Sequence, residues 1–147
     1  MYNALMADFH FKHPISVRYG DLDPQWHVNN AKFLVFIEQT RFAYLVSLGL
    51  FDGKHFFDLG LIVADIHVAY LKPIEPLDKV EVAARVAKIG NKSILFEARV
   101  QNPESGELYA TSEIVMVAYD YHTKSTRPVP PEWREKIAAF EQWEQPQ

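Results

Sequence analysis

The fold is decided by residues 29–49, which read NNAKFLVFIEQTRFAYLVSLG. Neither glycine nor proline interrupts residues 31–48, and Gly49 then supplies the kind of stop that is found just past helix ends. Asn29 and Asn30 are both N-cap candidates, because a short amide side chain accepts hydrogen bonds from the free backbone N–H groups of a first helical turn. The spacing therefore predicts a helix over residues 31–48.

The apolar side chains of this helix extend around most of its circumference and do not form a single stripe. A helix of that kind is buried, or is covered by a partner on its second side. Its polar positions Glu38, Gln39 and Arg41 are close together in sequence, and we expect them to face a cleft or an interface. The apolar positions are Phe33, Leu34, Phe36, Ile37, Phe42, Tyr44, Leu45 and Leu48.

The segments on either side of the helix have the alternating pattern of β-strands. The runs after the helix are separated by short links rich in Gly, Pro and Asn, which favours an antiparallel meander. The expected strands are residues 11–19, 61–71, 79–89, 93–101 and 108–121. An antiparallel sheet of about five strands wrapped around one long central helix lets each element bury its apolar face, so the fold class is α+β.

The C-terminal segment, residues 128–147, opens on prolines and then becomes amphipathic through Trp133, Ile137 and Phe140. Proline is tolerated in the first turn of a helix, where its missing N–H has no intrahelical partner. A short surface helix is therefore expected at about residues 131–143, with Pro131 in its first turn.

The chain has the length of one domain, at 147 residues and 17.0 kDa. A chain of this size buries roughly 68–70% of its unfolded surface, enough for one core. We expect a single domain over residues 1–147, with its core at about 12–127. The helix is too apolar to be covered by one sheet face, and an edge strand would be exposed, so a homodimer or a dimer of dimers (a tetramer) is expected.

Charge and cysteine content exclude several classes of function. The formal charge of −4 and the pI near 5.8 give no basic surface for nucleic acid. The absence of cysteine removes disulfides and thiolate chemistry, and fits a reducing compartment. Residues 1–12 do not read as a signal peptide, and no run reaches the roughly 20 apolar residues of a membrane span. A soluble, cytoplasmic protein without a membrane partner is expected.

The densest group of reactive side chains is DLDPQWHVNN, residues 21–30, between the first strand and the helix. A helix N-terminus offers free N–H groups and partial positive charge, which suit an oxygen that becomes negative during acyl transfer. Asp23 is then placed to attack the same carbonyl or to activate a water. The same residues also have a plain structural reading: Asp-x-Asp-Pro is a common turn, His27 can bond a loop carbonyl, and Asn29 and Asn30 are good caps.

A resemblance bears on this choice. Residues 17–34, VRYGDLDPQWHVNNAKFL, resemble the signature of the 4-hydroxybenzoyl-CoA thioesterase family of hotdog proteins, and Asp-x-x-x-His-Val-Asn-Asn segments are similar in acyl-CoA and acyl-ACP thioesterases. The later strands, with Tyr70-Leu71-Lys72-Pro73 closing the second, are also similar, so the likeness spans roughly residues 12–130. It implies a hotdog fold and an acyl-CoA thioesterase that releases free acid and CoA, with acyl-ACP as another possible substrate.

Carried over residue by residue, the resemblance makes Asp23 the catalytic carboxylate and His27 the histidine that assists it. The acyl-ACP pattern has an Asn two residues after the Asp, where this chain has Gln25. Glu38 is a second acid of interest, because some hotdog thioesterases carry their carboxylate on the helix; with Asp23 present, a structural or pocket-lining role is expected for it. Backbone N–H groups near Val28, Asn29 and Asn30 would hold the oxyanion, and Asp23 would act as nucleophile or as general base.

A CoA substrate would need a local basic group, because its phosphates are anionic and the chain is acidic overall. Candidates on the middle strands and their hairpin are Lys88, Lys92 and Arg99, although such side chains on a sheet usually face water. No cofactor is expected, and the histidines have no metal-ligand spacing.

Two rival functions remain open on the same fold. A hotdog domain can bind an acyl ligand without hydrolysing it, although a pure binder has no need of a carboxylate beside a helix N-terminus. A hotdog dehydratase or hydratase would use a different pairing of acid and histidine, which Asp23 and His27 could mimic.

Overall fold

A computed structural model describes residues 8–144 and 147; most of the N-terminal stretch that was expected not to be a signal peptide lies outside the described residues. The strands are β1 (Phe11–Ile15), β2 (Leu61–Tyr70), β3 (Val80–Ile89), β4 (Ser93–Gln101), β5 (Leu108–Asp120) and β6 (Ser125–Thr126). The helices are α1 (Asn30–Ser47), α2 (Phe56–Leu59) and α3 (Pro131–Glu141), with a 3-10 turn at Tyr19–Asp21.

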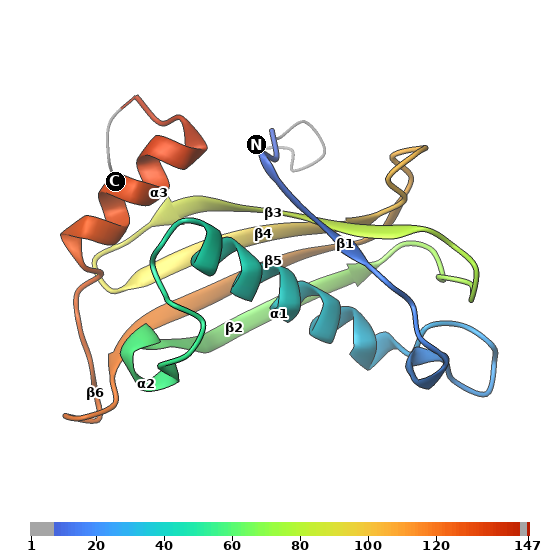
Figure 1. Cartoon of the computed structure of the whole chain (residues 1–147), viewed down its shortest axis with the longest axis horizontal. Coiled ribbons are helices and arrows are strands. Elements are labelled where there is room, and N and C mark those ends of the chain that lie inside the picture. The colour runs from blue at the N-terminus through green and yellow to red at the C-terminus, as the bar shows by residue number, and fades with distance from the viewer. Residues whose placement is uncertain (1–7, 145–146) are drawn as a thin grey trace.

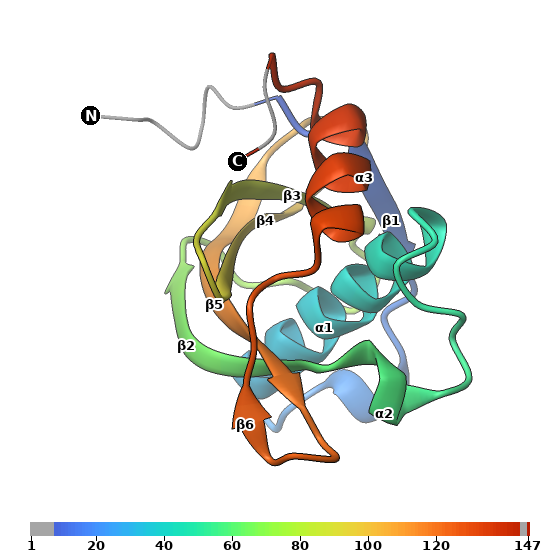
Figure 2. The ribbon, with the colours of Figure 1, turned by 90° about the vertical axis from the view of Figure 1, so that its left-hand side faces the viewer.

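The sheet is antiparallel and curls around α1. Its strand order is β1-β3-β4-β5-β2, and β6 adds a short pairing to β5. Figure 1 shows α1 lying across one face of the sheet, and the end-on view of Figure 2 shows the strands curving around it. Completely buried side chains of α1 and of the strands, such as Tyr44, Ile94 and Val100, share one apolar cluster. The expected α+β arrangement is therefore present, with a central helix of 18 residues.

The bounds of the predicted helices and strands are correct to within two residues, except at the end of the first strand. The first strand ends at Ile15 and not at residue 19, because the chain turns at Tyr19–Asp21. The C-terminal helix begins at Pro131 as expected but ends at Glu141, since Gln142 adopts a left-handed conformation with φ of 59°. The sequence interpretation also missed α2 and β6, which are short and have no periodicity of their own.

The edge strand β2 departs from simple alternation. A bulge between Val63 and Asp65 shifts its register against β5. Leu61 and Val63 therefore lie opposite Ala118 and Met116, which face α1. Ile62 was expected to share that face with Ile66, but it lies on the outer face of the sheet. A bulge inserts one residue, so every side chain before it changes face relative to a regular strand.

The terminal helix α3 closes the end of the sheet remote from the 19–28 loop (Figure 1). Glu141, on its last turn, is buried, and its Oε1 accepts hydrogen bonds from the Tyr44 hydroxyl at 2.7 Å and from the Val86 N–H at 3.1 Å. Val86 lies at a second bulge, between Val86 and Lys88 of β3. A bulge interrupts the hydrogen bonds between neighbouring strands, so some backbone groups need another partner. One carboxylate thus joins α1, β3 and α3.

This carboxylate should make stability depend on pH. Burial raises the pKa of Glu141 above its ordinary 4.5, although both hydrogen bonds oppose this change. Because the folded pKa is raised, its stabilising contribution is complete below about pH 4.5 and is lost as the pH rises through the folded value. Glu141→Gln, which has no such proton to lose, should therefore gain stability relative to wild type as the pH rises from 4 to 8. Urea unfolding of both proteins at the two pH values checks this, and a difference that does not change with pH would contradict it.

Candidate active site

The loop between β1 and α1 is organised around the buried carboxylate of Asp21, which is 1% exposed. Its Oδ2 accepts from the Arg18 backbone N–H at 2.8 Å, and its Oδ1 lies 3.4 Å from the Arg18 guanidinium and 4.0 Å from the Lys32 ammonium. The Asp21 carbonyl oxygen in turn accepts from the Asn29 N–H at 2.8 Å. Asp21 therefore sets the path by which the chain enters the helix.

Asp21→Asn should weaken the fold and leave the chemistry of the site in place. An amide removes the negative charge that faces Arg18 and Lys32, and it turns one acceptor into a donor within a buried site. Such a loss costs about 1–3 kcal/mol of stability. Urea unfolding measures this cost; a variant as stable as wild type would show that Asp21 does not organise the loop.

Asp23 is held by the turn that follows it. Its Oδ1 accepts hydrogen bonds from the Gln25 N–H at 2.9 Å and from the His27 N–H at 3.3 Å. The backbone closes the same turn, since the Trp26 N–H donates to the Asp23 carbonyl and the Asp23 N–H donates to the His27 carbonyl. The expectation that the Asp23 side chain stabilises a turn therefore holds for Oδ1 only. Across residues 8–144 and 147, the hydrogen bonds to its side chain all reach Oδ1, and none reaches Oδ2.

The tip of the turn is strained. Trp26 adopts a φ of 64°, a left-handed conformation that is unfavourable for a bulky side chain. Strain of this kind persists where the surrounding structure imposes it, and it concentrates at functional sites. The Trp26 ring is half exposed and makes an edge contact with Tyr19, at 6.1 Å between ring centroids.

The N-terminus of α1, beside this turn, has fewer free backbone N–H groups than the sequence indicated. Asn29 is the N-cap, and its side chain accepts from the Ala31 N–H at 2.9 Å. The Val28 N–H already donates to the Ile74 carbonyl, and the Asn29 N–H to that of Asp21. Of the three N–H groups expected to hold an oxyanion, only that of Asn30 has no hydrogen bond to the part of the chain that the structure describes.

The end of β2 forms the opposite wall, which sequence reasoning did not assign to the site. The Tyr70 hydroxyl donates to the Asn30 carbonyl at 2.9 Å, and its ring packs edge-on against Phe33, 5.1 Å between centroids. Lys72 follows and binds Glu107 at 2.8 Å, an ion pair that raises the pKa of Lys72. The sequence signal was the Tyr-Leu-Lys-Pro segment at residues 70–73, noted as part of the resemblance without a role in the site.

These walls enclose a cavity of about 380 Å³, here called the helix-mouth cavity. It brings together Asp23, Gln25, His27 and Asn30 from the predicted site, whereas Asn29 serves as the cap. The full lining is Asp23, Gln25, His27, Val28, Asn30, Phe33, Tyr70, Leu71, Lys72 and Pro73.

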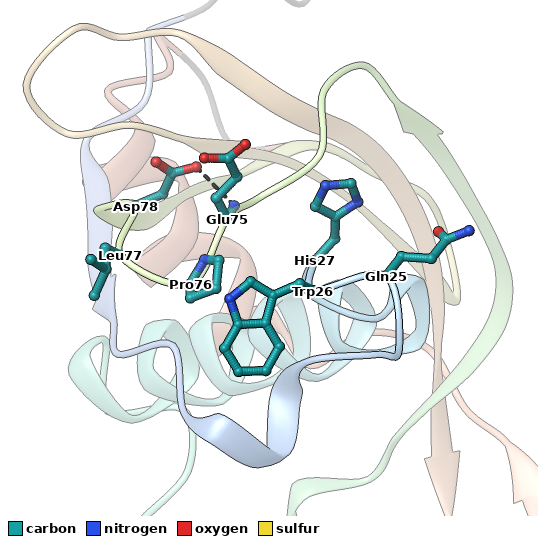
Figure 3. Close-up of a pocket in the computed structure, with 7 residues that line it drawn as sticks. All are labelled: Gln25, Trp26, His27, Glu75, Pro76, Leu77 and Asp78. Carbon is teal, nitrogen blue, oxygen red and sulfur yellow. Dashed lines mark hydrogen bonds between the residues drawn. The ribbon is translucent and has the colours of Figure 1, made fainter.

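A larger neighbouring cavity, about 470 Å³, lies between the loop and the turn that follows β2. Figure 3 shows Trp26 and His27 on one side of it and the turn of residues 75–78 on the other, where the Asp78 carboxylate accepts from the Glu75 N–H at 2.9 Å. Its charged groups are both acidic, and Asp23 is not among its lining residues. The helix-mouth cavity, with a carboxylate and a helix N-terminus together, is therefore the better candidate for chemistry, although it is the smaller.

The remaining predicted residues lie elsewhere. Glu38 is exposed in the middle of α1, close to Arg41, whose pKa is lowered chiefly by burial and is raised in part by Glu38. Lys88 and Lys92 are at the far end of the sheet beside α3, where Lys92 contacts the Thr126 hydroxyl at 3.2 Å (Figure 1). Arg99 is on the outer face, stacked 4.4 Å from the Phe9 ring centroid. One copy of the chain does not bring these cations to Asp23.

Neither a metal-binding cluster nor a membrane-spanning helix is found in the part of the chain that the structure describes. Among residues 8–144 and 147, no group of three or more His, Asp or Glu side chains is arranged to hold a metal ion. None of the helices formed by those residues is long and apolar enough to cross a membrane.

Comparison with known proteins finds relatives that are named as thioesterases. The long-chain acyl-CoA thioesterase FadM of Escherichia coli K12 is 30% identical over 124 residues, which is 84% of this chain and 93% of FadM. A thioesterase from Thermus thermophilus, solved in complex with coenzyme A and Zn, superposes with a TM-score of 0.81 at 34% identity, over 93% of this chain and 98% of that one. The probable thioesterase YbaW of Escherichia coli gives a TM-score of 0.73 at 26% identity, over 87% and 96% of the two chains.

The profile of the Thioesterase-like superfamily matches residues 17–137, which include the whole candidate site and every strand from β2 to β6. The curled antiparallel sheet around one helix agrees with this match, as do the solved thioesterase structures with the same fold. The chain belongs to the Thioesterase-like superfamily and is a thioester hydrolase.

Proposed function

We propose that this thioester hydrolase cleaves acyl-CoA to free acid and CoA, with Asp23 as its catalytic carboxylate. The observation that carries the proposal is the state of that side chain. Two backbone N–H groups hold Oδ1 and none of the described residues binds Oδ2, and Asp23 lines the same cavity as Asn30, the first residue of α1. A fixed carboxylate beside a helix N-terminus suits a reaction in which a carbonyl oxygen becomes negative.

In this proposal Asn30 donates its backbone N–H to the thioester carbonyl oxygen. The N–H groups of Val28 and Asn29 hold the loop and the cap instead. The partial positive charge of the helix N-terminus adds to the effect of this donor as the oxygen acquires its charge. Of the three backbone N–H groups first considered for the oxyanion, only that of Asn30 is proposed as a donor. The partial positive charge at the N-terminus of α1 assists it.

Two routes lead from this arrangement to the same products. In the first, Asp23 takes a proton from water while the water oxygen adds to the thioester carbon; the C–S bond then breaks, CoA leaves as thiolate and recovers the proton. In the second, Asp23 Oδ2 itself adds to that carbon, CoA leaves, and water hydrolyses the resulting anhydride. Asp23 needs its negative charge in both.

His27 is proposed to assist from the boundary between the two cavities. Its side chain lines both the helix-mouth cavity and the neighbouring larger one, and its N–H and carbonyl both bond Asp23. The imidazole is therefore close to any group that bridges the two cavities, and it can donate or accept a hydrogen bond there according to its tautomer. Gln25, which lines the same two cavities, is a second polar contact for the substrate.

The proposed substrate class, acyl-CoA, is based on what the relatives are named to act on or were solved with. FadM is named as a long-chain acyl-CoA thioesterase, and the Thermus thermophilus relative was solved with coenzyme A. Lys72 is the cation of the helix-mouth cavity, but Glu107 already neutralises it. Lys88, Lys92 and Arg99 stay predictions for the CoA phosphates. A cytoplasmic location is proposed from the absence of cysteine.

Product analysis separates hydrolysis from the two rival functions. The purified protein is incubated with a saturated acyl-CoA and with its 2-enoyl analogue, and products are identified by mass spectrometry. The proposal predicts free acid and CoA from the saturated substrate. A hydroxyacyl-CoA formed from the enoyl substrate, without free CoA, would assign a hydratase, and recovery of both thioesters intact would leave a binding protein.

A further inference from the structure

Tyr70 connects the end of β2 to the first turn of α1. Its hydroxyl donates to the Asn30 carbonyl at 2.9 Å, and its ring packs edge-on against Phe33 at 5.1 Å between centroids. Tyr70 and Asn30 also line the same helix-mouth cavity as Asp23. One hydroxyl thus binds the backbone of the residue whose N–H is the proposed donor to the substrate, although the proposed chemistry gives Tyr70 no part.

The strand end that carries Tyr70 is firmly held. Tyr70 is paired with Ala110 in the ladder between β2 and β5. Just beyond it, the N–H groups of Leu71 and Lys72 both donate to the Tyr109 carbonyl, at 2.8 and 3.1 Å. Although 48% of Tyr70 is exposed, its backbone is fixed by these bonds and its ring by the contact with α1. The hydroxyl is therefore a fixed point that can position the start of α1.

Two consecutive peptide units at the start of α1 are held in different ways. In the first, the Asn29 carbonyl accepts from the Lys32 N–H at 2.8 Å, and the Asn30 N–H has no partner among the described residues. In the second, the Ala31 N–H donates to the Asn29 side chain at 2.9 Å, and the Asn30 carbonyl accepts from Tyr70. Because the two units share the Cα atom of Asn30, fixing the second also restricts the direction of the free N–H.

The support that this N–H receives from the other side comes from the loop that carries Asp23. The Asn29 N–H donates to the Asp21 carbonyl of that loop at 2.8 Å. Tyr70 adds a contact from the sheet, which does not depend on the loop. The position of the Asn30 N–H relative to the Asp23 carboxylate is therefore set from two sides.

We propose that Tyr70 is a positioning residue for the oxyanion: through the Asn30 carbonyl it directs the Asn30 N–H at the thioester carbonyl oxygen. This inference rests on the proposed function, which makes that N–H the donor. A donor stabilises the developing charge only if it lies about 2.7–3.1 Å from the place that the oxygen occupies in the transition state. A displacement of about 1 Å can cost about 100-fold in rate. Tyr70 thus contributes to the rate without contacting the reacting atoms.

Tyr70→Phe removes the hydroxyl and keeps the ring beside Phe33. We expect kcat to fall about 10–100-fold with KM within about twofold of wild type, because the donor acts on a charge that develops after binding. The thermal midpoint should fall by only about 2–5 °C, as for the loss of one hydrogen bond in a chain of this size. An unchanged kcat would overturn the proposal.

Tyr109→Phe is the matched control. The Tyr109 hydroxyl also donates to a backbone carbonyl, that of Lys79 at 3.4 Å, but Tyr109 is not among the residues that line the two cavities. This variant should lose some stability and keep its kcat. Equal losses of kcat in the two variants would show a general effect of stability and would overturn the role of Tyr70.

The stretching frequency of the bound thioester carbonyl is a readout that a purely structural role would not change. An acyl-CoA with ¹³C at that carbonyl is bound to Asp23→Asn, and its infrared band is compared with that of the free ligand. A hydrogen bond to the oxygen weakens the C=O bond, so the band should move to lower frequency. Adding Tyr70→Phe should reduce this shift by about half or more, whereas adding Tyr109→Phe should leave it unchanged.

The infrared result separates this inference from the proposed function. If wild type releases no thiol from any acyl-CoA, the proposed function fails, and a smaller shift without the Tyr70 hydroxyl still supports its effect on the Asn30 N–H. An equal shift with and without that hydroxyl would overturn the inference, whether or not the protein hydrolyses the ligand.

Discussion

Asp23→Asn is expected to lower kcat by about 10²–10⁴-fold, the contribution of a positioned acid or base. The amide retains an oxygen that accepts from the Gln25 and His27 N–H groups, so the turn keeps its shape. What the variant lacks is the negative oxygen that takes a proton from water or adds to the thioester carbon. Because binding contacts are unchanged, the loss should appear in kcat and in kcat/KM together, with KM nearly constant.

The control for this result is the neighbouring aspartate. Asp21→Asn removes a carboxylate from the same loop, but one that is buried against Arg18 and Lys32 and is absent from the helix-mouth cavity. It should lower the free energy of unfolding and retain much of the activity at low temperature. Activity of the Asp23 variant within about threefold of wild type would remove Asp23 from the chemistry.

Tyr44→Ala is expected to cost about 3–5 kcal/mol of stability, as for other large aromatic side chains removed from a core. Tyr44 is completely buried in the last turn of α1, and its ring makes edge contacts with Phe11, Phe96 and Phe140. The change empties this space and also deprives the buried Glu141 carboxylate of its 2.7 Å hydrogen bond. Urea unfolding monitored by tryptophan fluorescence measures the loss.

Tyr44→Phe separates the ring from the hydroxyl. It keeps the three ring contacts and removes only the donor to Glu141, so it should cost about 1–3 kcal/mol. Burial raises the pKa of Tyr44, so the hydroxyl keeps its proton and remains a donor at every pH at which the protein is folded. A phenylalanine variant as unstable as the alanine variant would show that the hydrogen bond, and not the packing, dominates.

The central helix and the strands β3, β4 and β5 were predictable because each carries a strong local signal. The run from Ala31 to Leu48 has no breaker, and the alternation in β3 and β4 continues for most of each strand. Periodicity of this strength reflects burial on a fixed face, and tertiary structure rarely overrides it. The bulges at Ala64 and Ala87 were not predictable, because one inserted residue leaves the composition of the strand unchanged.

The candidate site was predictable in part. The sequence brings Asp23, Gln25, His27 and Asn30 close to the helix mouth because they are neighbours along the chain. The hydrogen bond from the Val28 N–H to Ile74 and the position of Tyr70 against Asn30 could not be predicted from the sequence, because both contacts join segments far apart along the chain. Those contacts decide which backbone donor remains free.

The most direct test of the account is release of free thiol from a panel of short, long and aromatic acyl-CoAs, measured alongside the thermal midpoint for wild type, Asp21→Asn and Asp23→Asn. We expect hydrolysis by wild type and a lowered midpoint for the Asp21 variant. For the Asp23 variant we expect a wild-type midpoint, with thiol release reduced at least about 100-fold. Thiol release by a folded Asp23 variant at close to the wild-type rate would contradict it.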